Sequence, residues 1–145
     1  MQRRSLNIQS IYHNYKAVPF ILCVSLLIDY SFTFHFAGSA QNILDYEFSP
    51  LLVYAVEHDV VIPYMLLTAS FYYFAAYAVL SLLHDTDIYP IGVAVILLMS
   101  ITHVMGGLSW YVLKEAYSNA VLTLSLISVI MTITLFAYEV IRKGH

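Results

Sequence analysis

Four long apolar runs divide the chain, and each is long enough to cross a membrane. They cover residues 17–37, 60–83, 88–110 and 120–141. A helix needs about 20 mostly apolar residues to cross the hydrocarbon core of a bilayer. The turn at residues 84–87 is short, so the second and third helices should be antiparallel neighbours. The pattern predicts an all-α membrane protein, with four transmembrane helices in an antiparallel bundle that forms a single domain.

The connections between the runs carry signals of their own. Gly38 is expected to end the first helix. The connection at 39–59 contains no lysine or arginine. Within it, Ser49 and Pro50 are typical of a helix start, because serine caps the first turn and proline fits the first helical position. We expect a short interfacial helix to follow, lying at the membrane surface or against the bundle. Residues 111–119 are expected to form a polar connection.

The first run carries an aspartate, Asp29, at membrane depth. A carboxylate there costs roughly 3 kcal/mol on insertion scales, so it should face a protected interior. With a rotation of about 100° per residue, Ser25, Asp29 and Thr33 form one stripe, whereas His35 points to a different side. We therefore expect the first helix to turn its Asp29 stripe toward the other three helices.

The composition agrees with a membrane protein and restricts the partners. The chain has 145 residues, of which 61% are hydrophobic and only 10% are charged, whereas soluble domains carry about 25% charged residues. The formal net charge is −3, and the six basic residues form no patch suited to nucleic acid. The single cysteine, Cys23, excludes an intramolecular disulfide. The expected partner is therefore the lipid bilayer, and nucleic acid is not expected.

The basic residues predict how the bundle is oriented. All but one of them lie beyond the same end of the predicted helices: Arg3, Arg4, Lys16, Arg142 and Lys143. Only Lys114 lies at the other end. The positive-inside rule then predicts a multi-pass protein of the cell membrane with both termini in the cytoplasm. The start of the chain also has features of a cleavable signal sequence, but the length of its apolar run and its aspartate favour a retained span.

Three polar residues are expected to meet near the outer end of the bundle. At a rise of about 1.5 Å per residue, Asp29 lies about 20 Å from Lys16, and His103 about 24 Å from Asp87. The outward connection brings Glu47 to the same side. Asp29, Glu47 and His103 are therefore the candidate catalytic residues, and they form a polar site expected to bind a metal, an ion or a small ligand. Imidazole and carboxylate ligands suit zinc or iron, and zinc with an open position activates water, so an enzyme of this kind would be a metal-dependent membrane hydrolase.

Other interpretations of the same residues remain open. Asp29 also suits a packing role in which it bonds to hydroxyl groups of neighbouring helices. His35 and His103 lie at similar predicted depth, as the axial ligands of a b-type haem in an electron-transfer subunit would. The small and polar stripes on the last two helices would alternatively contact a membrane-protein partner or a second copy of the chain, making it an accessory or assembly subunit of a larger complex.

Two short patterns in the first part of the chain carry a family resemblance. Asp29 and Thr33 form an Asp-x3-Thr pair, and Glu47 is followed by Ser49 and Pro50. The chain resembles uncharacterised small four-span membrane proteins, mostly archaeal, that have Asp-x3-Thr followed by Glu-x-Asn-Pro. Ser49 stands at the position of the asparagine. The resemblance implies no activity, but it implies that Asp29 and Glu47 belong to one site.

Overall fold

The computed structural model describes residues 14–144, and all of its regular structure in that range is helical. The helices are α2 (Ala17–Ala37), α3 (Ala40–Tyr46), α4 (Pro50–Glu57), α5 (Val61–Leu83), α6 (Tyr89–Val112) and α7 (Glu115–Gly144). Four of them, α2, α5, α6 and α7, are long and apolar enough to cross a membrane. The predicted all-α fold with four spans is confirmed, and the chain is described below as a membrane protein.

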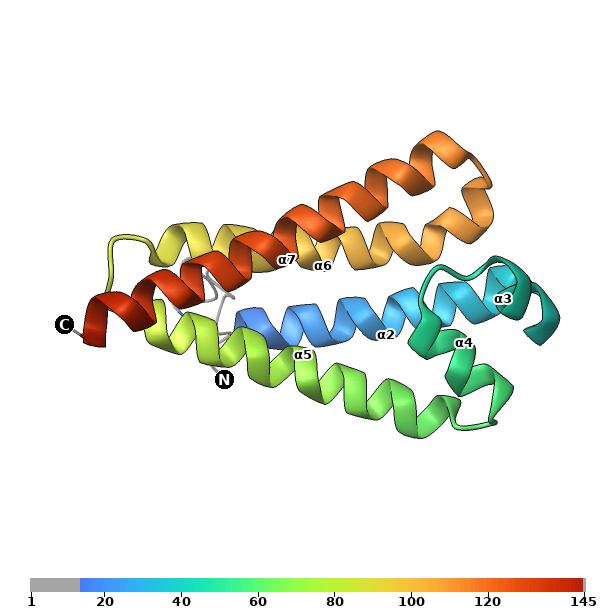
Figure 1. Ribbon diagram of the computed structural model, residues 1–145, viewed down its shortest axis with the longest axis horizontal. Coiled ribbons are helices and arrows are strands. Elements are labelled where there is room, and N and C mark those ends of the chain that lie inside the picture. The colour runs from blue at the N-terminus through green and yellow to red at the C-terminus, as the bar shows by residue number, and fades with distance from the viewer. Residues whose placement is uncertain (1–13, 145) are drawn as a thin grey trace, which may run out of the picture.

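The four long helices run alternately in opposite directions, and α3 and α4 pack at one end of the bundle (Figure 1). Helix α2 packs against α5 and α6, and α7 packs against α6. Lys16, Arg142 and Lys143 lie at the end away from α3 and α4, and Lys114 lies at the opposite end. Arg3 and Arg4 lie outside the described residues. The sidedness of the protein in its membrane stays a prediction.

Helix α2 ends at Gly38, as the sequence predicts. Gly38 adopts a left-handed conformation with a φ of 73°, which favours glycine. The next residue, Ser39, caps an additional helix, α3, because its hydroxyl accepts a hydrogen bond from the backbone N–H of Asn42 at 3.2 Å. The side-chain amide of Asn42 donates to the carbonyl of Ala37 at 2.7 Å. These bonds reverse the chain immediately after the first span.

Helix α4 starts at the predicted position and lies against the bundle. The Ser49 hydroxyl accepts from the backbone N–H of Leu52 at 3.3 Å, and Pro50 is the first helical residue. Leu52 is only 3% exposed and packs in a cluster with Leu26 and Tyr30 of α2. The second part of the 39–59 connection therefore covers one end of the bundle.

The last two spans are joined more tightly than the sequence predicts. The expected polar connection at 111–119 is almost entirely helical, and only Leu113 and Lys114 separate α6 from α7. Leu113 makes the turn with a left-handed φ of 51°. The hydroxyl of Tyr117 then donates to the carbonyl of Met105 at 3.1 Å and ties α7 back to α6. The polarity of this segment marks the end of the apolar run, but all of its residues except Leu113 and Lys114 are helical.

The C-terminal end of α7 carries a buried carboxylate. The side chain of Glu139 is completely buried and pairs with the exposed Arg142, at 2.7 Å between Oε1 and Nη2. Lys143 lies 3.6 Å from the same oxygen and donates to the carbonyl of Leu82 on α5 at 2.8 Å. This ion-pair cluster joins α7 to α5 at the end of the bundle that is rich in basic residues.

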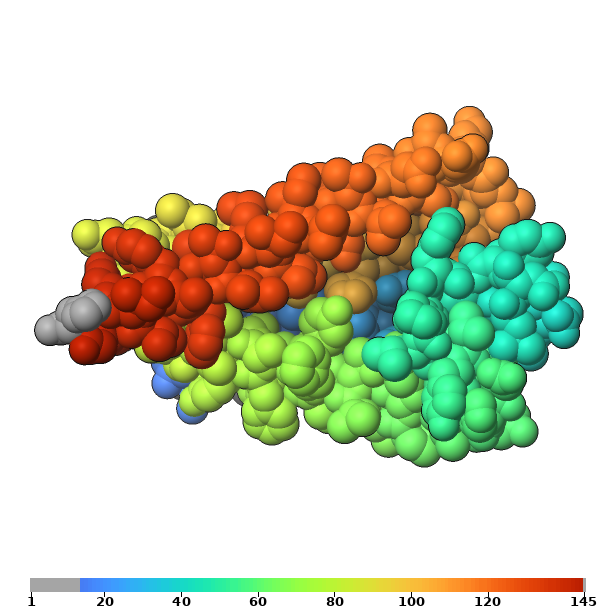
Figure 2. All heavy atoms as spheres, viewed as in Figure 1, coloured from blue at the N-terminus to red at the C-terminus, as the bar shows by residue number. Residues whose placement is uncertain are grey.

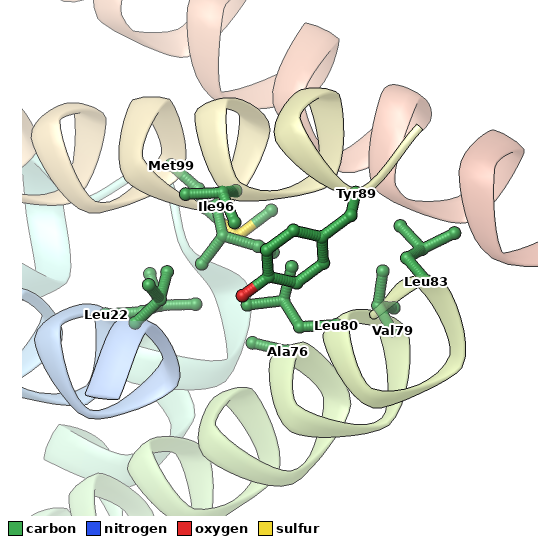
Figure 3. Close-up of a cluster of buried hydrophobic side chains, with 10 residues drawn as sticks. Leu22, Ala76, Val79, Leu80, Leu83, Tyr89, Ile96 and Met99 are labelled. Atoms are coloured by element: carbon green, nitrogen blue, oxygen red, sulfur yellow. The ribbon is translucent and has the colours of Figure 1, made fainter. Parts of the chain in front are cut away.

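A buried apolar cluster joins α2, α5 and α6 toward the same end (Figure 3). Its members include Leu22, Ala76, Val79, Leu80, Leu83, Tyr89, Ile96 and Met99. The Tyr89 ring lies among side chains from all three helices. Because lipid tails are as apolar as leucine, such a cluster stabilises a membrane bundle through close packing rather than through removal of side chains from water.

Helices α2 and α6 lie in close contact beside Asp29. A Cβ atom added at Gly107 would lie 2.6 Å from the carbonyl oxygen of Asp29 and 2.8 Å from the Cβ of Phe32. A Cβ added at the neighbouring Gly106 would lie 3.4 Å from an Asp29 carboxylate oxygen, which is ordinary contact. Only a residue without a side chain fits at 107, and small residues generally allow helices in membranes to approach in this way.

We predict that Gly107→Ala destabilises the protein by about 1–3 kcal/mol, the usual cost of overpacking, because the clashing atoms include backbone that cannot rotate away. Gly106→Ala is the matched control, since it makes the same change one residue earlier without the clash. Thermal unfolding in detergent measures both variants. Equal midpoints for the two variants would contradict the close approach of α2 and α6 at Gly107.

Candidate functional site

An aspartate and a histidine from different helices meet inside the bundle. The Nδ1 atom of His103 on α6 lies 3.0 Å from Oδ2 of Asp29 on α2. Their side chains are 15% and 20% exposed, respectively. Ser25 and Thr33, which share the predicted stripe with Asp29, are both buried. The stripe therefore faces the bundle interior, as the sequence predicts.

The second ring nitrogen of His103 is a buried polar atom. Its Nε2 has no hydrogen-bond partner among the described residues. The Tyr72 ring packs edge-on against the imidazole, with 5.1 Å between the ring centroids. A buried polar atom without a partner costs about 1–3 kcal/mol. The site thus holds an imidazole that is fixed on one side by a carboxylate and has an unused nitrogen on the other.

The pair lines a cavity of about 310 Å³ whose wall includes residues of α2, α4, α5, α6 and α7. Two carboxylates, those of Asp29 and Glu47, belong to its wall, and no described residue of the wall is lysine or arginine. The wall also holds many hydroxyl groups, among them those of Thr33, Ser49, Tyr64, Thr68, Tyr72 and Ser109. The wall therefore holds many polar groups, and among its described residues only the imidazole of His103 is able to carry a positive charge.

Glu47 is positioned by the two short helices. It follows the last residue of α3, and its Oε1 accepts a hydrogen bond from the backbone N–H of Ser49 at 2.9 Å. Burial is the largest effect on the pKa of Glu47 and raises it above the ordinary value. The charge of Asp29 also raises this pKa, whereas the hydrogen bonds from the Ser49 N–H and from Trp110 lower it. Asp29 and Glu47 therefore act on one another electrostatically across the cavity.

The predicted three-ligand metal centre is not assembled. Within residues 14–144, no three histidine, cysteine, aspartate or glutamate side chains are grouped closely enough to hold one metal ion. Asp29 and His103 are in contact, but Glu47 is held by the Ser49 N–H at another part of the cavity wall. The three residues share one cavity without forming the ligand set for zinc or iron that the sequence suggests.

The two histidines proposed for a haem are not brought together. His35 is exposed, and its ring packs against Phe36, with 4.9 Å between the centroids. It does not line the cavity that contains His103. Its position follows from the helical rotation that separates it from the Asp29 stripe, and the arrangement does not suit a b-type haem held between α2 and α6.

A second polar stripe, on α5, was missed by the sequence analysis. Tyr64, Thr68 and Tyr72 all line the cavity, and they follow one another at intervals of four residues. That spacing places them on one face of the helix. The four-residue spacing of these hydroxyl groups is visible in the sequence, but the many other aromatic residues of this span make it hard to recognise.

The Asp29–His103 contact determines what the imidazole can do. When Asp29 is ionised its oxygens can only accept, so Nδ1 donates to them and Nε2 keeps its lone pair. A carboxylate that orients a histidine in this way fixes its tautomer. The site can therefore accept a hydrogen bond or a proton at Nε2.

Comparisons with protein-family models, with curated proteins and with solved structures found no match for this chain.

We predict that Glu47 lowers the stability of the protein as the pH rises. Its carboxyl has a higher pKa in the folded protein than the ordinary 4.5, so between these two values the folded state binds more protons than the unfolded state, and stability falls with increasing pH. The measurement is the unfolding midpoint from pH 4 to 7 for the wild type and Glu47→Gln. As the pH rises, the unfolding midpoint of the wild type should fall relative to that of Glu47→Gln. Midpoints that change in parallel with pH would contradict the raised pKa of Glu47.

Proposed function

We propose that this membrane protein binds a small ligand with a hydrogen-bond-donating head, such as a protonated amine, in the cavity beside Asp29 and His103. The observation that carries the proposal is the buried carboxylate–imidazole pair at a cavity wall, where the Nε2 of His103 has no partner among residues 14–144. A hydrogen-bond donor on the ligand would pair with this nitrogen, and a positive charge on the ligand would balance the negative charge of the nearby carboxylates.

The charges around the cavity favour a cation over an anion. Asp29 and Glu47 contribute two carboxylates, and the described wall contains no lysine or arginine to receive a phosphate or a carboxylate. Tyrosine rings, including those of Tyr64 and Tyr72, also face this space. Aromatic faces attract ammonium groups by about 0.5–2 kcal/mol, with more at sites shielded from water. Both the charges and the rings therefore select the same kind of ligand.

The dimensions of the cavity suit a small molecule. A volume of about 310 Å³ is at the lower end of the range of roughly 300–1,000 Å³ that is usual for ligand pockets. The carboxylate and the imidazole are supplied by two spans whose separation is fixed by the close contact at Gly107. This rigidity keeps the pair in position without a ligand, which lowers the cost of binding.

Butylamine is a suitable probe, and Trp110 is a built-in reporter. Trp110 is the single tryptophan of the chain, and it interacts with Glu47. Titrating the detergent-purified protein at neutral pH should change the Trp110 fluorescence with saturation. Asp29→Asn and His103→Gln should each weaken binding at least tenfold, since hydrogen bonds to charged groups contribute about 1.5–3 kcal/mol.

Matched controls lie on the same part of the fold. Asp45→Asn and His35→Gln make the same chemical changes at exposed residues that do not line the cavity. Both controls should bind butylamine as the wild type does. Wild-type affinity in folded Asp29→Asn and His103→Gln proteins, or equal losses in all four variants, would refute the assignment of the site.

A further inference from the structure

A second, apolar cavity adjoins the polar one at Tyr72. It has a volume of about 180 Å³ and is lined by side chains of four spans, among them Leu22, Ala75, Ala76, Met99 and Val129. Its wall is almost free of polar groups apart from the hydroxyls of Tyr72 and Thr132. The two cavities therefore differ sharply in chemistry.

The two linings follow one another along the helices. Tyr72 of α5 belongs to both cavities. On α6, Met99 of the apolar cavity lies one turn from His103 of the polar one, and on α7, Val129 lies one turn from Ser125. The apolar part extends along α6 to Ile96, which is about 10 Å from His103 at the helical rise. The two cavities therefore adjoin at Tyr72, and the two together are called the channel below, with a polar end and an apolar end.

The channel is open on the side between α5 and α7. These helices diverge toward the end that holds α3 and α4 (Figure 1). The space-filling view shows a hollow between them, with part of α2 visible at its floor (Figure 2). Both helices are candidate membrane spans, so the opening faces the lipid. A molecule that resides in the bilayer can enter from the side without crossing water.

We infer that the channel binds a single-chain membrane amphiphile with an amine headgroup, its head beside Asp29 and Glu47 and its hydrocarbon chain in the apolar part between α5 and α7. This inference rests on the proposed function and adds the chain to the ligand. The polar end selects the head by charge, because its described wall holds two carboxylates and no lysine or arginine. The apolar end selects the chain.

The test compares three probes in nanodiscs of phosphatidylcholine: butylamine, dodecylamine and dodecyl phosphate. Referred to the concentration of free probe in water, each methylene that enters the apolar part should tighten binding about three- to fourfold. Dodecylamine should therefore bind at least tenfold more tightly than butylamine, and at least tenfold more tightly than dodecyl phosphate, which places an anion beside the carboxylates. Native mass spectrometry or a thermal shift measures binding.

Substitutions at two alanines of α5 distinguish binding of the probe in the channel from its partition into the bilayer. Ala75→Phe fills the apolar part, whereas Ala78→Phe adds the same ring at an exposed position three residues later. Ala75→Phe should bind butylamine as before but should no longer bind dodecylamine more tightly than butylamine. Ala78→Phe should bind both amines as the wild type does. Val129→Phe fills the same space from α7 and is a second route if Ala75→Phe does not fold.

The outcomes distinguish the inference from the proposed function. If dodecylamine keeps its advantage in both Ala75→Phe and Val129→Phe, the apolar part is not the chain site and the inference fails, although butylamine binding that depends on Asp29 still supports the proposed function. Preference for dodecyl phosphate would overturn the amine head. If Asp29→Asn bound butylamine and dodecylamine as tightly as the wild type does, both the inference and the proposed function would be overturned.

Discussion

A carboxylate inside a membrane needs a partner, and the contact between Asp29 and His103 supplies it. Leaving a charge unpaired there is costly, so the two residues fix how α2 and α6 face one another. The 3.0 Å contact requires a close approach of the helices, which Gly107 permits on the adjoining turn. The pair consequently has two roles: it holds two spans together, and it presents an oriented imidazole to the cavity.

The polar and apolar parts of the interior are separated along the bundle. Toward the end with α3 and α4, the interior is the polar cavity, and α4, which Ser49 caps, forms part of its wall. Toward the other end it is a packed cluster around Leu80 and Tyr89. The apolar cavity beside Met99 lies between these regions. A bundle whose spans diverge on one side can therefore admit a ligand while the opposite end remains packed.

The sequence predicted much of this architecture and part of the site. Apolar runs determine the spans, and the Asp29 stripe had to face inward because a carboxylate cannot face lipid at low cost. Helical rise placed His103 at a depth where it could meet Asp29. The position of Glu47 depends on α3 and on the turn before Ser49, which no periodicity reveals, so its separation from the pair could not be predicted. The helix that replaces the polar connection near Tyr117 was also missed, because polarity marks where a span leaves the membrane and not where a helix stops.

The most direct test of the account is the ¹⁵N NMR spectrum of the His103 imidazole in the uniformly labelled protein, assigned by its absence in His103→Gln. We predict a ring whose Nδ1 carries a proton and is hydrogen-bonded, and whose Nδ1 chemical shift changes in Asp29→Asn. A ring protonated only at Nε2, with shifts that do not respond to Asp29→Asn, would contradict the pairing on which the fold and the site depend.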